Sequence, residues 1–192
     1  MNNLLKKLGK ILKKPFESFV KIKGIYQVTE IDCTSNEAKA LCDEGKIEEL
    51  LDKYSVRVTK YENIVPDVGL AVIAENLNEA SPSADFNQLI QYIAVGTDNT
   101  AVTAGDTQLG AEVVRKLVAT RSRVGGASKN AILLGYTEGN GNTLREVSAF
   151  SGDASATPNS GKIMSHSLMT VSVAKTVSIA VFFEITHTLT SS

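Results

Sequence analysis

Several residue types that carry common enzyme chemistry are scarce in this 192-residue chain, which has no tryptophan, two cysteines and two histidines. Neither His166 nor His187 has an acid or a cysteine near it in the sequence at the spacing of metal ligands. No G-x-S-x-G elbow occurs among the serines. We therefore expect no catalytic residues, no metal site, no cofactor and no enzymatic activity. By strand alternation, His187 is predicted to be a hydrogen-bonded histidine at the edge of the core.

The two cysteines, Cys33 and Cys42, are nine positions apart, which fits no C-x-x-C redox or zinc pattern. We interpret them as free thiols in a reducing compartment. A disulfide between them is the alternative, and it would need a tight local fold that the sequence does not demand.

An excess of charge is also missing, since the formal net charge is −1. This balance argues against a protein whose whole surface binds nucleic acid. The hydrophobic content of 43% is enough for a core. The length suits one domain with an appendage.

The glycine-containing segment YIAVGTDNTAVTAGDTQLGAEVVRK, residues 92–116, also lacks the spacing of a ligand-binding loop. Its glycines at 96, 105 and 110 match neither G-x-G-x-x-G nor G-x-x-x-x-G-K-[ST]. A cation loop would need regularly spaced oxygen ligands, and the candidates do not have that spacing. A structural turn is favoured, because Asp and Asn side chains bond their own backbone and tolerate left-handed φ. The candidate oxygen donors are Asp98, Asn99, Asp106 and Glu112.

What the sequence does have is a basic, amphipathic start. Residues 1–23 carry seven lysines and one glutamate, and their apolar residues follow the period of a helix. Pro15 is expected to end this helix. Lysines interrupt any signal-peptide core, and the apolar run is too short to span a membrane. The apolar stripe is Leu4, Leu5, Leu8, Ile11 and Leu12, and the other positions include Lys6, Lys7 and Lys10.

Three roles for this helix stay open. It could lie on an anionic membrane surface, dock into a groove of a partner protein, or pack on its own domain. A helix this short is marginal by itself, so something must bury it.

Helical and strand signals alternate before residue 80. Ser35 is a helix cap residue for an apolar pattern that runs to residue 51, with Gly45 as a break. Residues 54–61 alternate with period two and predict a strand. Pro66 suits the first position of a third helix that runs to about Asn78. Its apolar residues are Val68, Ala71, Val72, Ala74 and Leu77. Residues 79–85 are a predicted loop.

From residue 89 onward the pattern is that of β-structure. Strands are predicted at 89–95, 113–124 and 131–137, with a last strand near 176–189 and an Asn-Gly hairpin at 137–143. The fold class is therefore α+β, mainly β: an antiparallel β-sandwich preceded by a mostly helical N-terminal region. The expected divisions are 1–23 (anchor helix), 24–62 (helix and strand extension) and 63–192 (helix followed by the sandwich).

The last strand has the clearest pattern, with alternate residues on an apolar and a polar face. The apolar face is Val177, Ile179, Val181, Phe183, Ile185 and Leu189, and the polar face is Thr176, Ser178, Glu184, Thr186 and Thr188.

A basic run lies on the predicted strand at 113–124, where Arg115, Arg121 and Arg123 would point to one side. We expect a solvated or ion-paired face, for example with Glu146. A nucleic-acid track is the weaker alternative.

The order of these segments resembles small bacteriophage virion proteins of the tail-fibre, collar and baseplate-attachment type. In those proteins a helix precedes a strand ending in I-A-[VI]-G-T. A Thr/Ala-rich loop, D-T-x-L-G-x-E, a basic strand and a strand with [TL]-[IL]-R-E then follow. The resemblance covers roughly residues 63–190. The matching segments are Gly69 to Ala74, Ile93 to Thr97 (including Gly96), Asp106 to Glu112 (including Gly110), Arg115-Lys116 and Leu144-Arg145-Glu146.

The resemblance implies a non-enzymatic virion protein that is made in the host cytoplasm and assembles in symmetric copies. Its partners would be copies of itself and other virion proteins, with no small-molecule substrate and no specific nucleic acid. It implies that the quoted loop is a structural turn whose Asp106 and Glu112 orient backbone or pair with Arg145. Arg145 and Glu146 would point to opposite faces of a strand. Two alternatives stay open: a receptor- or glycan-binding β-module of a tail fibre, and an accessory protein held at a membrane surface by the basic helix.

Overall fold

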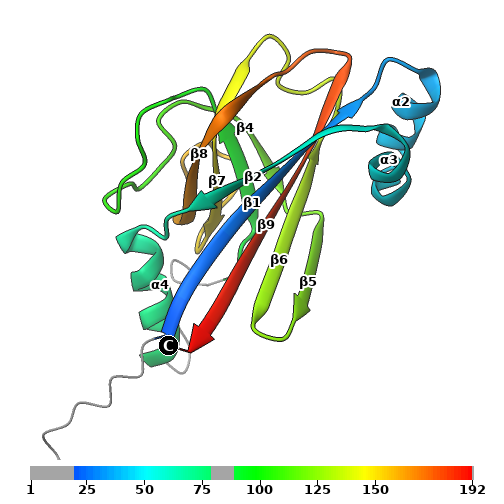
Figure 1. Cartoon of the computed structure of the whole chain (residues 1–192). Coiled ribbons are helices and arrows are strands. Elements are labelled where there is room, and N and C mark those ends of the chain that lie inside the picture. The colour runs from blue at the N-terminus through cyan, green and yellow to red at the C-terminus, as the bar shows by residue number, and fades with distance from the viewer. Residues whose placement is uncertain (1–19, 79–88, 192) are drawn as a thin grey trace, which may run out of the picture.

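The computed structural model describes residues 20–78 and 89–191, and within them the chain is mainly β, with two antiparallel sheets (Figure 1). The five-stranded sheet has the order β2-β1-β9-β6-β5, and the four-stranded sheet has the order β4-β3-β7-β8. The first sheet comprises β1 (Val20–Asp32), β2 (Ser55–Asn63), β5 (Thr120–Val124), β6 (Ala127–Leu134) and β9 (Ile179–Ser191). The second comprises β3 (Tyr92–Gly96), β4 (Glu112–Leu117), β7 (Thr143–Ser151) and β8 (Lys162–Ala174).

Strand β1 corrects two predictions about the N-terminal region. Residues 20–23, expected at the end of a helix, belong to this strand, because Lys21, Ile22 and Lys23 also fit a period of two. The strand pairs with β9 over its whole length, from Val20↔Ser191 to Asp32↔Ile179. The predicted extension 24–62 is thus part of the main sheet. Residues 1–19, with most of the predicted anchor helix, lie outside the described residues.

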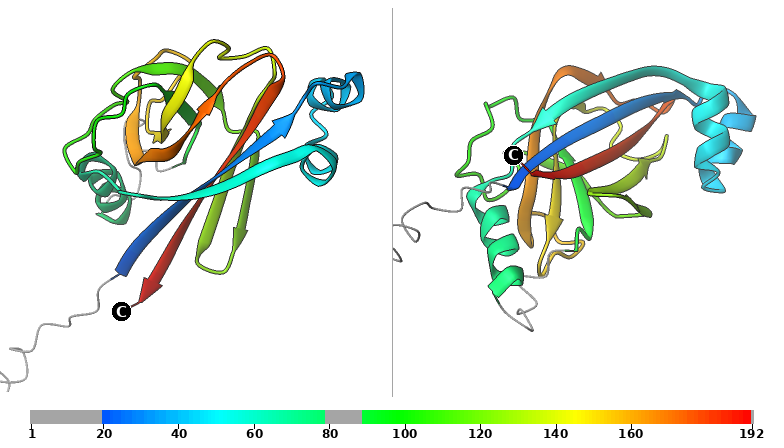
Figure 2. Two further views of the ribbon diagram at one scale, coloured as in Figure 1. Left: turned by 45° about the horizontal axis from the view of Figure 1, so that its top comes forward. Right: turned by 60° about the horizontal axis from the view of Figure 1, so that its bottom comes forward.

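The helical hairpin between β1 and β2 follows the sequence prediction. Ser35 Oγ accepts a hydrogen bond from the Ala38 N–H at 3.1 Å and caps α2 (Asn36–Asp43). Gly45, with φ +67°, separates α2 from α3 (Ile47–Tyr54), since glycine adopts this φ at no steric cost. Both helices cover one end of the outer face of the five-stranded sheet (Figure 2). The buried residues there are Ile31, Cys33, Ala38, Leu41, Cys42, Leu50, Ala131, Ala180 and Phe182. Both cysteines are free thiols, and burial raises the pKa of each.

The third helix, α4 (Asp67–Asn78), begins after Pro66 as predicted, and of its predicted apolar face Val68 and Val72 are packed whereas Leu77 is not. Val72 is fully buried, whereas Leu77 is 85% exposed. Gly69 lies against β8, where an added Cβ would come within 2.8 Å of the Ile163 carbonyl oxygen. Beside this close contact, Ile73 rather than Leu77 packs on the core. Helix α4 lies at the opposite end of the molecule from α2 and α3 (Figures 1 and 2). None of the helices in 20–78 and 89–191 has the length and apolar character needed to cross a membrane.

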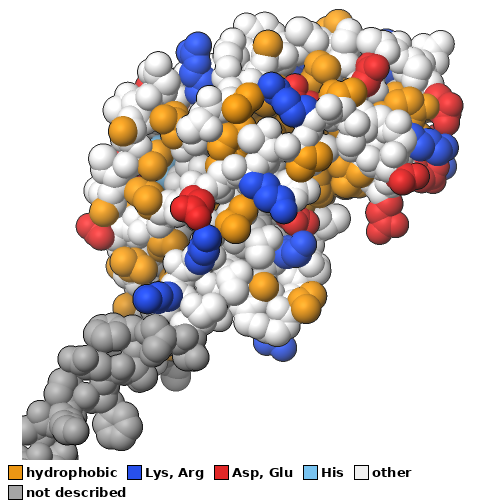
Figure 3. Space-filling model, in the orientation of Figure 1, with side chains coloured by type: hydrophobic (Ala, Val, Ile, Leu, Met, Phe, Trp, Pro, Cys, Tyr) orange, Lys and Arg blue, Asp and Glu red, His pale blue; other side chains and the backbone are white. Residues whose placement is uncertain are grey.

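One hydrophobic core joins the two sheets, and it accounts for the burial of alternate residues in β9. Val181, Phe183 and Ile185 are buried in it, as predicted. The opposite face of β9 is also buried where α2 and α3 cover it, so Phe182 is 6% exposed. Beyond the helices that face is solvated and carries cross-strand ion pairs such as Lys129–Glu184 and Lys23–Glu62 (Figure 3). The prediction was wrong at its two ends, since Val177 and Leu189 are 63% and 53% exposed.

The predicted strand at 113–124 is two strands in different sheets. The chain crosses at Val118 and Ala119, whose N–H groups donate to the carbonyl oxygens of Gln91 and Ala131 respectively. Arg115 therefore lies in one sheet, and Arg121 and Arg123 lie in the other, so the predicted basic face is wrong.

The Asn-Gly segment at 137–143 also connects the two sheets and is not a hairpin, although Gly139 and Gly141 have the expected positive φ. The tight hairpin lies instead at Gly125-Gly126, which joins β5 to β6 with Val124 opposite Ala127.

Candidate functional site

Several of the residues that carry the virion-protein resemblance meet at the loop 97–111, between β3 and β4. Gly96 ends β3 beside Glu146 of β7, and Thr97 donates its N–H to the Ala111 carbonyl at 3.0 Å. Thus segments that lie far apart in the sequence form one structure. We call Asp98, Asp106, Gly110, Glu146 and His166 the Glu146 cluster.

Glu146 is the centre of this cluster, and its side chain is 2% exposed. Its carboxylate accepts hydrogen bonds from the N–H groups of Gly110 at 3.0 Å, Ala111 at 2.8 Å and Asp98 at 3.3 Å. Glycine is required at position 96 because a Cβ there would collide with this carboxylate and with the Ala111 carbonyl. The buried carboxylate therefore holds both ends of the loop against β3.

His166 of β8 bridges two carboxylates. Its Nδ1 lies 2.7 Å from Asp106 Oδ2 and its Nε2 lies 3.2 Å from Glu146 Oε2. Sequence spacing did not indicate this pairing, because His166 is 60 residues from Asp106 and 20 from Glu146. A backbone bridge from Ile64, at the end of β2, fixes the position of His166. His166 therefore has two acidic neighbours in space, although none lies near it in the sequence at a metal-ligand spacing.

The cluster keeps its acids ionised. Burial acts to raise the pKa of Glu146, but hydrogen bonds from His166 and the loop amides outweigh it and hold the pKa below its usual value. For Asp106 the balance is the same, with Thr103 and His166 as the donors that lower the pKa against the effect of burial. Hydrogen bonds from Thr100 are the main cause that lowers the pKa of Asp98. Each acid is stabilised as an anion by donors inside the protein.

Turn formation accounts for the remaining polar residues of the loop, as predicted. Asp98 Oδ1 accepts from the N–H groups of Asn99 at 2.8 Å and Thr100 at 3.2 Å. Asp106 accepts from the Thr103 N–H at 3.0 Å and hydroxyl at 2.7 Å. A cavity of about 280 Å³ opens between this loop and His166.

Glu112 and Arg115 form a second buried polar unit on β4. The guanidinium donates two hydrogen bonds of 2.8 Å to the Glu112 carboxylate, and both side chains are at most 3% exposed. Arg115 also lies over the Phe150 ring, 4.0 Å from its centroid, and donates to the Ser160 carbonyl. Of the two roles expected for Asp106 and Glu112, the structure has the orientation of backbone, through the N–H groups of Thr103 and Asn159, and not the pairing with Arg145. Arg145 and Glu146 do point to opposite faces, as predicted.

This arrangement has the chemistry of a structural anchor. The carboxylates are occupied by backbone amides, hydroxyls and His166, and their hydrogen bonds all serve to hold the loop. Within the described part of the chain, no group of three or more His, Cys, Asp or Glu side chains is placed to hold a metal ion. The predicted partner-binding residues Leu4, Leu5, Leu8, Ile11, Leu12, Lys6, Lys7 and Lys10 lie outside the described residues.

Comparisons with known proteins give no further assignment of the site. No protein-family model matches the chain, and neither a curated protein nor a solved structure is significantly similar to it.

Proposed function

We propose that this chain is a non-enzymatic structural protein of a bacteriophage virion, in the tail, the collar or neck, or the fibre attachment. It assembles as symmetric copies and docks onto neighbouring virion proteins. Its two sheets act as a β-sandwich, a rigid body whose loops and N-terminal segment are available for contacts with other subunits. The protein is made in the host cytoplasm and resides in the particle.

The observation that carries this proposal is the use of the motif residues. Gly96, Asp106, Gly110 and Glu146 all belong to the sequence pattern of such virion proteins, and all serve to hold one loop. Glu112, from the same pattern, anchors β4 through Arg115. A sequence pattern whose residues bond to one another inside the protein is typical of a family whose members share a fold. This favours a structural role.

The solvated face of the five-stranded sheet supports assembly through selected contacts. Its cross-strand ion pairs, such as Lys23–Glu62 at 2.8 Å, interleave both signs of charge along the face (Figure 3). Charged, paired faces resist non-specific association. We therefore assign docking to the apolar stripe of residues 1–14.

The test uses virions purified from the native source, analysed by mass spectrometry, with variants of the chain expressed during infection. Removing residues 1–14 should leave thermal unfolding unchanged but abolish incorporation, because four buried apolar side chains provide roughly 1.5–3 kcal/mol each before ordering costs.

Matched variants separate the two faces of the anchor. Replacing Leu4, Leu8 and Ile11 with glutamine should abolish incorporation, and replacing Lys6, Lys7 and Lys10 with glutamine should only change its salt dependence. Absence of the full chain from purified virions would refute the proposal. Incorporation of the truncated chain at full occupancy would refute the role of the anchor, and strong binding to anionic liposomes without any virion partner would favour the membrane alternative.

A further inference from the structure

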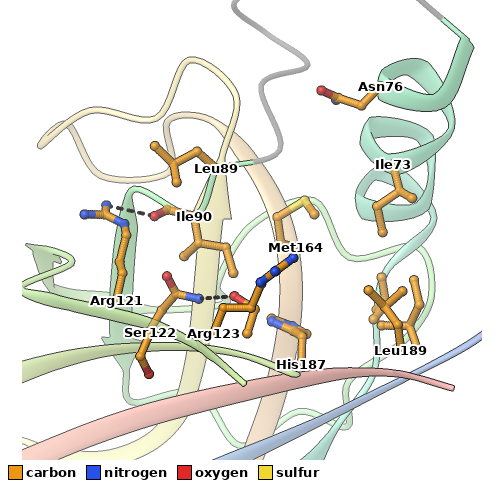
Figure 4. Close-up of a pocket in the computed structure, with 14 residues that line it drawn as sticks. Ile73, Asn76, Leu89, Ile90, Arg121, Ser122, Arg123, Met164, His187 and Leu189 are labelled. Carbon is orange, nitrogen blue, oxygen red and sulfur yellow. Dashed lines mark hydrogen bonds between the residues drawn. The ribbon is translucent and has the colours of Figure 1, made fainter. Parts of the chain in front are cut away.

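A second cavity, of about 800 Å³, opens between the two sheets beside α4 (Figure 4). We call it the sheet cavity. Its volume falls within the range of roughly 300–1,000 Å³ that is typical of small-molecule sites. One wall is apolar. It is formed by α4 and the residues just before it, by the segment before β3, and by β8. The residues of this wall are Val65, Ile73, Leu89, Ile90 and Met164.

The opposite wall is a row of cross-strand neighbours on the inner face of the five-stranded sheet. The register pairs Asn63 with Gly24, Gly24 with His187, His187 with Ser128 and Ser128 with Arg123. We call these five residues the interior row. Three of them, His187, Ser128 and Arg123, line the sheet cavity.

The interior row contains polar groups that the protein itself leaves unpaired. Among the described residues, four buried side-chain polar atoms lack a hydrogen-bond partner: both amide atoms of Asn63, Nε2 of His187 and Oγ of Ser151. Three of these four atoms belong to the interior row, and of the two residues that carry them His187 lines the sheet cavity. A buried polar atom without a partner has lost its hydrogen bonds to water and gained none in the protein, so such a concentration requires an explanation.

Positive charge lies beside these atoms. Arg121 donates to the Ile90 carbonyl at 3.0 Å, and no carboxylate of the described residues lies within ion-pair distance of Arg121 or Arg123. The described residues that line the sheet cavity include no Asp or Glu. In Figure 4 the Arg123 side chain extends from β5 into the cavity, toward the side on which Met164 and His187 lie. The site therefore combines an apolar wall with a guanidinium that lacks a counter-ion.

We propose that the sheet cavity binds an amphipathic carboxylate, whose apolar chain lies between α4 and the sheets and whose carboxylate is held by Arg123 and His187. Strands lie about 4.8 Å apart, which places β5 and β9 roughly 10 Å apart on either side of β6. The long Arg123 side chain covers much of that separation. An N–H of the guanidinium would donate to one carboxylate oxygen, and the His187 imidazole, whose Nε2 is buried, would donate to the other after a rotation of its ring. This inference is independent of the virion role proposed above.

The first measurement is a calorimetric titration of the full chain with decanoate, decan-1-ol and decyltrimethylammonium, which share one apolar chain. Decanoate should bind saturably at one site per chain. The alcohol should bind at least about 10-fold more weakly, because it loses the charge-assisted hydrogen bonds, and the cation should not bind. The imidazole NMR signals of His187 should shift during the decanoate titration.

Variants of two arginines and of His187 test where the carboxylate of the ligand binds. Arg123→Ala should weaken decanoate binding by about 10-fold or more. Arg145→Ala, an exposed arginine on β7 outside the cavity, should leave it unchanged and controls for general attraction of the anion to basic residues. His187→Phe should weaken decanoate binding and at the same time raise the unfolding temperature, since it removes an unpaired buried nitrogen. A histidine with only a structural role would not produce these opposite effects.

Three results would overturn the proposal. The first is the absence of saturable decanoate binding at millimolar concentration. The second is equal binding of all three decyl compounds, or equal losses in Arg123→Ala and Arg145→Ala. The third is binding to vesicles that contain phosphatidylglycerol without binding to free decanoate, which would make this face a membrane contact.

Discussion

The Glu146 cluster and the sheet cavity are two polar regions of the same protein that differ in whether their buried polar atoms have hydrogen-bond partners. In the cluster, the buried carboxylate of Glu146 receives three backbone N–H groups and His166. In the interior row, Asn63 and His187 keep buried polar atoms without partners among the described residues. In the first region the buried carboxylate has its hydrogen-bond partners within the protein, and these bonds hold a loop. The second is open to further hydrogen bonds, and this difference indicates where an additional molecule would bind.

The largest effect on stability is expected when the hydrogen bonds of the Glu146 cluster are removed. Glu146→Ala should lower the free energy of unfolding by about 3–5 kcal/mol, because it leaves loop amides and His166 without their buried acceptor. Arg145→Ala, one residue away on the exposed face, should change it by no more than about 0.5 kcal/mol. Urea denaturation of both variants measures the contrast. Similar values for the two would mean that the loop does not depend on Glu146.

Variants of β9 test whether its outer face is buried only where α2 and α3 cover it. Phe183→Ala and Phe182→Ala should each cost about 3–5 kcal/mol, since both rings are buried, one between the sheets and one under α2 and α3. Thr186→Ala, on the same face as Phe182 but beyond the helices, should cost no more than about 0.5 kcal/mol.

Urea denaturation of the three β9 variants gives these values. A small loss for Phe182→Ala would show that α2 and α3 contribute little to the stability of the sheet.

Much of the local structure could be predicted from the sequence, because local chemistry specifies it. The Ser35 cap, the break at Gly45 and the helix after Pro66 depend on neighbouring residues. The turn bonds of Asp98 are equally local. In the second half, alternation predicted the last strand, whereas β8 was not predicted and the stretch 113–124 is two strands.

Long-range features could not be predicted in the same way. The His166 bridge joins residues 20 and 60 positions apart, and the crossing at Val118 depends on which sheet each half-strand joins. Lysines at 21 and 23 fit both a helical and a strand period, and pairing with β9 decides between them. The interior row likewise exists only in the register of five strands. Its unpaired atoms have no signature in any local stretch of sequence.

The two regions should also differ in their response to acid. The pKa values of Asp98, Asp106 and Glu146 are lowered in the folded protein, so their ionised forms contribute stability that is present above about pH 4.5. That contribution is lost as the pH falls through the folded pKa values. Glu146→Gln should therefore show a flatter decline in unfolding free energy below pH 4.5 than the wild type. Parallel profiles for the two proteins would contradict a role for Glu146 in acid sensitivity.

The smallest effect is expected at His187 and lies in a higher pH range. Burial lowers the pKa of His187 to about 4, from an ordinary value of 6.5. Between pH 6.5 and 4 the unfolded chain takes up a proton that the folded chain excludes, so stability is full above pH 6.5 and falls as the pH decreases toward 4. His187→Phe removes this slope and the unpaired nitrogen, and should stabilise the protein by about 1 kcal/mol at pH 7, with a larger gain at pH 5. Thermal unfolding at both pH values measures the two gains. A gain that is independent of pH would mean that His187 is solvated in the folded protein, in which case the sheet cavity would lack the unpaired nitrogen on which its proposed ligand depends.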